Sequence, residues 1–214
     1  MNRSDLAWAL GAVLPHVGTT KGKYVGIEAR GGQIYVYATD AYTAGIARIP
    51  LGTEVDGFRH SYRCSISKSE AQDLMRFVRP AKKAHDAGEL TVHAVGEELH
   101  VATAEDSAVF DLVSDNPVTL DLILEVVSAT LSLPHDNATI VLQPSLAAKF
   151  AKAQRYETDR LRIYPFGGWG DVNGLAVVTV GEHFIGAVAG LTYEPPLDLS
   201  VVESFLKEAS VSEE

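Results

Sequence analysis

Hydrophobic and polar positions along the chain alternate with helical and strand periodicity in a repeating order. The first unit is predicted to contain a helix over 4–17 and strands over 24–29, 34–39 and 44–49. Ser4 is a candidate N-cap for the helix, and Pro50 stops the last strand. The turn Arg30-Gly31-Gly32-Gln33 between two apolar runs is typical of a β-hairpin.

The same order of helix and strands returns twice. Ser67 and Glu70 have capping-box spacing and open a second predicted helix, which ends near Pro80. A third helix is expected after Pro144. The strands expected after these two helices are 89–95, 98–103 and 108–113, then 160–164, 175–180 and 184–189. Three similar units of a capped helix followed by glycine hairpins indicate a repeat.

The segment 117–137 does not fit this order. Its apolar run, from Leu120 to Val127, suits a buried strand or a short helix, and periodicity does not decide between them. We predict an α+β fold of two domains, 1–116 and 117–194, with a tail over 195–214. Helices should pack on one face of antiparallel sheets and leave the other face exposed.

Charge is unevenly distributed along the 214 residues. The net charge is −10, yet ten of the 18 Lys and Arg residues fall within 68–83 and 149–162, around the second and third predicted helices. They are either a solvated helical face or a surface that neutralises DNA phosphates without reading sequence. The predicted DNA-binding residues are Lys68, Arg76, Arg79, Lys82, Lys83, Lys149, Lys152 and Arg155.

No set of residues in the sequence supports catalysis. The seven His residues form no helical i, i+4 pair and have no Cys cluster beside them, so we expect no metal and no cofactor. The loop Gly167–Gly170 lacks the Lys-Ser/Thr of a phosphate-binding loop. We therefore expect a protein that is not an enzyme. The lone Cys64 and the absence of a long apolar run favour a cytoplasmic protein that does not span a membrane.

One segment resembles a known family. The run Tyr35–Tyr42, which contains Ala38-Thr39-Asp40, resembles the Ala-Thr-Asp strand and turn of bacterial DNA sliding clamps, the beta subunit of DNA polymerase III. Residues 174–191 look like the closing hairpin of that family's last domain. Asp115-Asn116-Pro117 resembles the Phe-Pro segment that ends a clamp domain, without its Phe.

The resemblance implies a ring lined by helices, with double-stranded DNA in the hole and a DNA polymerase or a clamp loader docked outside. A chain of two domains would close such a ring as a homotrimer through edge-strand pairing. The resemblance also implies a partner-binding pocket formed by Thr39, Ala41, Tyr42, Thr43, Val188 and Leu191. The family's Gly-His-Arg-Leu after the Asp is here Ala-Tyr-Thr-Ala.

Three functional hypotheses follow. The first is a processivity factor that encircles DNA and tethers a polymerase. The second is a clamp-like regulator that binds the host clamp or its loader without encircling DNA, through the tail 195–214. The third is an unrelated α+β binding or structural protein, in which the helical charges are only a solvated surface.

Overall fold

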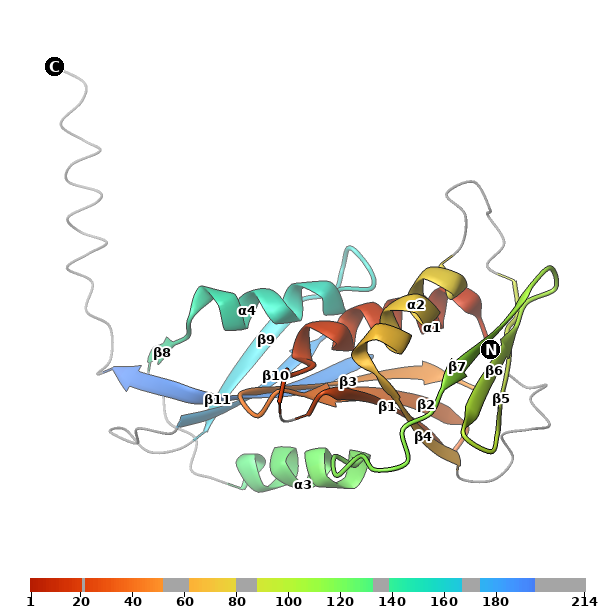
Figure 1. Ribbon diagram of the computed structural model, residues 1–214. Coiled ribbons are helices and arrows are strands. Elements are labelled where there is room, and N and C mark those ends of the chain that lie inside the picture. Colours follow the sequence, from red (N-terminus) through yellow and green to blue (C-terminus); the bar gives the residue numbers. More distant parts are fainter. Residues whose placement is uncertain (21, 52–61, 80–87, 133–138, 167–173, 195–214) are drawn as a thin grey trace, which may run out of the picture.

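The computed structural model describes residues 1–20, 22–51, 62–79, 88–132, 139–166 and 174–194. For 139–141, 165–166, 174 and 190–194 it describes the backbone alone. A large antiparallel sheet crosses the molecule, with helices on both of its faces and a small second sheet at one end (Figure 1). The tail 195–214 and the loop Gly167–Gly170 lie outside the described residues.

The first predicted unit is confirmed. It comprises α1 (Arg3–Val13), the 3₁₀ turn η1 (Leu14–His16), β1 (Tyr24–Arg30), β2 (Gln33–Thr39) and β3 (Thr43–Pro50). The N-cap of α1 is Asn2 rather than Ser4, because the Asn2 side chain accepts a hydrogen bond from the Ser4 N–H at 2.9 Å. The predicted hairpin turn has Gly31 and Gly32 at positive φ, as a two-residue turn between twisted strands requires.

The second and third units also contain the expected elements. The second has β4 (Tyr62–Ser67), α2 (Lys68–Val78), β5 (Thr91–Val95), β6 (Glu98–Ala102) and β7 (Ser107–Asp111). The third has α4 (Pro144–Phe150), the 3₁₀ turn η3 (Ala151–Ala153), β9 (Leu161–Phe166), β10 (Gly174–Val180) and β11 (Phe184–Glu194). Ser67 caps α2 as predicted, accepting from the Glu70 N–H at 3.1 Å.

The segment left open by the sequence is a helix, α3 (Leu120–Leu131), followed by the unpredicted strand β8 (Thr139–Val141). The Thr119 side chain caps α3 by accepting from the Leu122 N–H at 3.0 Å. An ion pair between Arg30 and Asp121, with an N–O distance of 2.8 Å, holds the first turn of α3 to β1. The Thr119 cap marks the start of a helix, a choice that hydrophobicity alone left undecided.

The large sheet joins strands from both ends of the chain. Its order is β4-β1-β2-β3-β11-β10-β9, with β8 also paired to β11, and β5-β6-β7 form the small sheet. Strands β3 and β11 pair over five positions, from Thr43–Val188 to Ala47–Phe184. One continuous sheet therefore spans the predicted boundary between 116 and 117, and the division into two domains stays a prediction.

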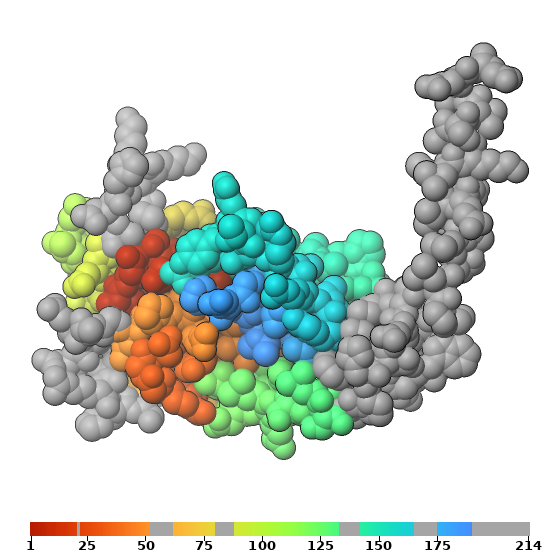
Figure 2. Space-filling view, turned by 180° about the vertical axis from the view of Figure 1, so that it is seen from behind, coloured from red at the N-terminus to blue at the C-terminus, as the bar shows by residue number. Residues whose placement is uncertain are grey.

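The two faces of the large sheet are covered differently. Helices α1, α2 and α4 lie on one face, which we call the three-helix face, and α3 lies on the other, the α3 face (Figure 1). In β2, Ile34 and Val36 pack into the main core beneath the three helices, whereas Tyr37 packs with Leu120 and Ile123 of α3. Figure 2 shows α3, in green, lying against the orange and blue strands.

This arrangement differs from the expectation of one exposed sheet face. Strand residues that point away from the three helices are apolar too, among them Ile46 in β3 and Val177 in β10. Apolar area on that side is removed from water only if another element covers it, and α3 does so.

Packing of α3 on the sheet predicts unequal costs for two neighbouring substitutions. Ile123→Ala, at a side chain that is 3 % exposed, should lower the free energy of unfolding by about 2–4 kcal/mol. The matched control Leu122→Ala, at a side chain that is 47 % exposed, should cost less than about 1 kcal/mol. Urea denaturation measures both, and equal effects would contradict the packing of α3 described above.

Candidate partner-docking pocket and helix face

A pocket of about 250 Å³ opens on the α3 face, beside the turn between β2 and β3. Its walls come from that turn, from α3, from the start of β10 and from the middle of β11. The lining residues are Thr39, Ala41, Tyr42, Thr43, Ala44, Val118, Leu122, Ile123, Val126, Leu175, Ala187, Val188 and Ala189. The lining is predominantly apolar, and Tyr42 at the mouth is 65 % exposed.

Five of the six residues predicted for a partner pocket are brought together here. Thr39, Ala41, Tyr42 and Thr43 come from the turn and Val188 from β11, although 145 residues separate Thr43 from Val188. The backbone of Leu191 pairs with Gly174, and its side chain lies outside the described residues. Whether this pocket binds a partner stays a prediction.

Sequence reasoning missed the wall that α3 contributes, which consists of Leu122, Ile123 and Val126. A signal for it was present in the strands. Residues 184–189 read Phe-Ile-Gly-Ala-Val-Ala, an almost continuous apolar run, whereas a strand with one solvated face should alternate. Such a run indicates a strand covered on both faces and therefore requires a further covering element.

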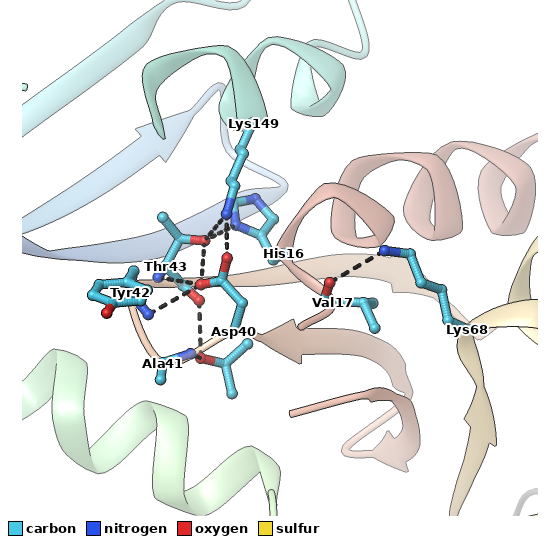
Figure 3. A network of polar contacts seen from close by, with 9 residues as sticks. His16, Val17, Asp40, Ala41, Tyr42, Thr43, Lys68 and Lys149 are labelled. Atoms are coloured by element: carbon cyan, nitrogen blue, oxygen red, sulfur yellow. Dashed lines mark hydrogen bonds and ion pairs between the residues drawn. The ribbon is translucent and has the colours of Figure 1, made fainter. Parts of the chain in front are cut away.

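Asp40 organises the turn that forms the pocket wall (Figure 3). Its Oδ1 accepts hydrogen bonds from the Tyr42 N–H at 3.0 Å, the Thr43 N–H at 2.7 Å and the Thr43 hydroxyl at 3.0 Å. The Asp40 N–H donates to the Thr43 carbonyl at 3.1 Å, and the Thr39 hydroxyl donates to the same oxygen at 2.9 Å. The Ala-Thr-Asp sequence therefore has a local structural role, because both polar side chains satisfy backbone groups of the turn.

Ala41 lies at the apex of this turn with φ +76°, in the left-handed region. An L-residue with a Cβ atom is disfavoured there by roughly 1–2 kcal/mol, whereas glycine is not. Ala41 therefore adds strain to the turn.

Lys149 on α4 reaches the same carboxylate from the three-helix face. Its Nζ forms an ion pair with Asp40 Oδ2 and lies 3.5 Å from the Thr43 hydroxyl oxygen (Figure 3). The side chains of Lys149 and Asp40 are 23 % and 14 % exposed. The contact joins the helix layer to the pocket wall across 109 residues of sequence.

His16 lies beneath this group and is fully buried. The Thr43 hydroxyl donates to Asp40, so His16 Nδ1, 3.0 Å away, is the donor to Thr43. Within the described residues His16 Nε2 has no hydrogen-bond partner, and the ring packs against Phe150 at 4.8 Å between centroids. Burial, reinforced by the positive charge of Lys149, lowers the pKa of His16 from 6.5 to about 4.

The pKa of Asp40 is also lowered. Burial opposes ionisation of this carboxyl, but hydrogen bonds from Lys149 and from the Thr43 and Tyr42 N–H groups outweigh it. At neutral pH the group is therefore an ionised Asp40, a charged Lys149 and a neutral His16. This arrangement holds a turn in place and presents no activated nucleophile.

Six of the eight predicted DNA-binding residues are described by the structure, and their environments differ. Arg79 and Lys152 are exposed, whereas Arg76 is exposed but forms an ion pair with Asp73 of the same helix. Lys68 donates to the Val17 carbonyl at 3.3 Å. Lys82 and Lys83 lie outside the described residues.

Lys149 and Arg155 are bound within the molecule. Arg155 forms an ion pair with Asp5 of α1, and its guanidinium carbon lies 5.1 Å from the centre of the Trp8 ring. Its side chain is 14 % exposed. Two of the predicted phosphate contacts are thus neutralised by carboxylates far away in the sequence.

The described residues contain no cluster of three His, Cys, Asp or Glu side chains suited to a metal ion. Cys64 is buried, and burial raises the pKa of its thiol to about 12. In the part of the chain that the structure describes, no helix has the length and apolarity needed to cross a membrane.

Comparison with known proteins identifies the fold. No protein-family model matches the chain, and no curated protein is significantly similar to it in sequence. Among solved structures it is similar to the DNA polymerase sliding clamp of Pseudomonas aeruginosa, with a TM-score of 0.61 and 11 % identity, over 91 % of this chain and 66 % of that one.

Similar agreement is found with two further bacterial proteins. For the DNA polymerase III beta subunit of Thermotoga maritima the TM-score is 0.63 at 9 % identity, over 92 % of this chain and 65 % of that one. For the Bacillus subtilis sliding clamp it is 0.63 at 9 % identity, over 92 % and 64 %. The chain thus has the sliding-clamp fold, as the resemblance predicted, and spans less than two thirds of the length of these clamps.

The backbone strain at Ala41 can be tested by substitution. Ala41→Gly should raise the free energy of unfolding by about 0.5–1 kcal/mol, since relief of the left-handed strain exceeds the entropy that glycine adds to the unfolded chain. The control Ala129→Gly, on the exposed side of α3, should lower it by about 1 kcal/mol. Urea denaturation distinguishes the two signs, and destabilisation by Ala41→Gly would show that the turn is not strained.

Proposed function

We propose that this chain is a sliding-clamp-type processivity factor, without catalytic activity, that encircles double-stranded DNA and tethers a DNA polymerase in the cytoplasm. The observation that carries the proposal is a sliding-clamp fold with an apolar pocket at the Ala-Thr-Asp turn. The pocket contains five of the six residues that the sequence resemblance implied. The fold and the pocket together support this proposal.

The three-helix face is the proposed DNA-facing surface. Arg79, directly after α2, and Lys152, on η3, are exposed there and would neutralise phosphates without contacting base edges. Weak contacts of this kind suit a protein that moves along a duplex. The net charge of −10 opposes binding of DNA elsewhere on the surface.

The pocket is the proposed docking site for the polymerase and for a clamp loader. Its lining suits apolar side chains of an extended partner segment, and the exposed Tyr42 ring offers a flat contact at the mouth. A pocket on the α3 face leaves the three-helix face available to DNA.

Closure of a ring needs contacts between copies of the chain. Among the described strands β4 and β9 end the large sheet, and β5 and β7 end the small one. A bridge between Ile66 and Leu112 joins β4 to the end of β7, so β9 and β5 are the terminal strands left for contacts with another copy. Leu161 on β9 is 46 % exposed and Val95 on β5 is 61 % exposed, so each terminal strand carries apolar surface. Pairing of β9 with β5 of the next copy would be head to tail and would close as a homotrimer.

A second candidate function is a clamp-like regulator that does not encircle DNA. The ion pairs of Lys149 with Asp40 and Arg155 with Asp5 favour it, because they remove two positive charges from the proposed DNA-facing surface. Such a protein would bind the host clamp or its loader, and charge on the three-helix face would not matter to it.

Binding of duplex DNA distinguishes the two proposed functions. The variant Arg79→Glu with Lys152→Glu should weaken binding of a fluorescent 30-base-pair duplex at least tenfold and flatten its salt dependence, because two phosphate contacts become repulsive. Arg48→Glu with Arg63→Glu is the matched control, since both arginines are exposed and lie on the α3 face of strands β3 and β4, away from the three-helix face. Equal losses in the two variants, or unchanged binding in the first, would exclude the three-helix face as the DNA-binding surface.

A further inference from the structure

Lys149 belongs to the basic segment assigned to DNA, but its amino group points away from solvent toward the β2–β3 turn (Figure 3). Lys152, three residues later on η3, is exposed. The two lysines therefore offer a direct comparison within one short helical stretch, between a lysine bound inside the molecule and an exposed one.

Asp40 connects Lys149 to the pocket wall. One carboxylate oxygen is bound by Lys149, and the other accepts the hydrogen bonds that fix the backbone of Tyr42 and Thr43. Both residues line the pocket. Loss of the lysine would leave a largely buried carboxylate without a counter-ion, which is unfavourable.

No other described side chain can take over this role. The titratable or charged groups that face Asp40 are Lys149 from α4 and His16 from η1. His16 is fully buried and donates from Nδ1 to Thr43, so it supports the hydroxyl and carries no charge at neutral pH. Lys149 is thus the cation on which the ionised turn depends.

We propose that Lys149 is a positioning residue of the docking pocket rather than a DNA contact. It reaches from the three-helix face, holds Asp40 and thereby fixes the 39–43 turn in the shape that forms the pocket wall. The inference rests on the proposed docking function of that pocket, and it reassigns one residue from the DNA-binding set to the partner-binding set.

Lys149→Met and Lys152→Met test the assignment in the intact chain. Lys149→Met should accelerate amide hydrogen exchange at Tyr42 and Thr43 about tenfold, since the turn loses its charge-assisted contact, and should leave affinity for the 30-base-pair duplex unchanged. Lys152→Met should leave both amides protected and lower the salt slope of duplex binding by about 0.9.

The pH profile of Asp40, followed by the ¹³C shift of its carboxyl carbon, separates positioning from a general loss of stability. In the wild type the pKa lies below the usual value of 3.8, so the turn keeps its ionised contacts well into acid and loses them as pH falls through that lowered pKa. In Lys149→Met the midpoint should move upward, because burial is then less opposed. Lys149→Arg keeps the charge and should keep the low midpoint.

Three results would overturn the proposal. The first is an unchanged Asp40 midpoint in Lys149→Met, and the second is an ordinary midpoint in the wild type and in Lys149→Arg. The third is a loss of duplex affinity in Lys149→Met equal to that in Lys152→Met, with the Tyr42 and Thr43 amides still protected. If no variant and no wild-type protein binds the duplex, DNA encirclement fails, while the amide and pH measurements still decide the role of Lys149.

Discussion

Strands β3 and β11 pair over five positions near the centre of the sheet, and this contact joins the first fifty residues to the last described strand. Gly45 and Gly186 are opposite each other in that pairing. A Cβ atom on Gly45 would lie 2.7 Å from the His16 ring, and one on Gly186 would lie 2.4 Å from a backbone oxygen, so neither position accepts a side chain without displacement. Close packing at this seam places the β2–β3 turn, α4 and β11 beside one another, and the pocket and the Lys149 contact depend on it.

The two proposed binding surfaces lie on different faces of the sheet. The three-helix face contains the exposed lysine and arginine assigned to DNA, while the α3 face contains the apolar pocket. Lys149 crosses from one to the other and ties the pocket wall to the helix layer through Asp40. The proposed DNA-facing surface and the proposed docking pocket thus lie on opposite faces of one sheet.

Much of the fold could be predicted from local signals in the sequence. Ser67 and Glu70 predicted the start of α2, and Gly31-Gly32 predicted the first hairpin, because helix capping and positive φ depend on a few adjacent residues. The family resemblance grouped five residues that do line one pocket, although no local pattern in the sequence relates them. Contacts over long sequence separations could not be predicted. They include the packing of α3 on the sheet and the ion pair of Lys149 with a carboxylate 109 residues away. Charge spacing on a helix shows that a lysine is on the surface of that helix, not which partner lies beside it.

Assembly is the property on which the proposed function depends most directly, because a chain that forms no closed ring cannot hold DNA topologically. The mass in solution, measured by light scattering coupled to size exclusion across a concentration series, tests it. For a chain of 23.0 kDa, we predict a stable trimer of about 69 kDa, as the head-to-tail closure of a two-domain clamp requires. A monomer at every concentration would contradict encirclement of DNA and would leave the clamp-like regulator as the function that fits the fold.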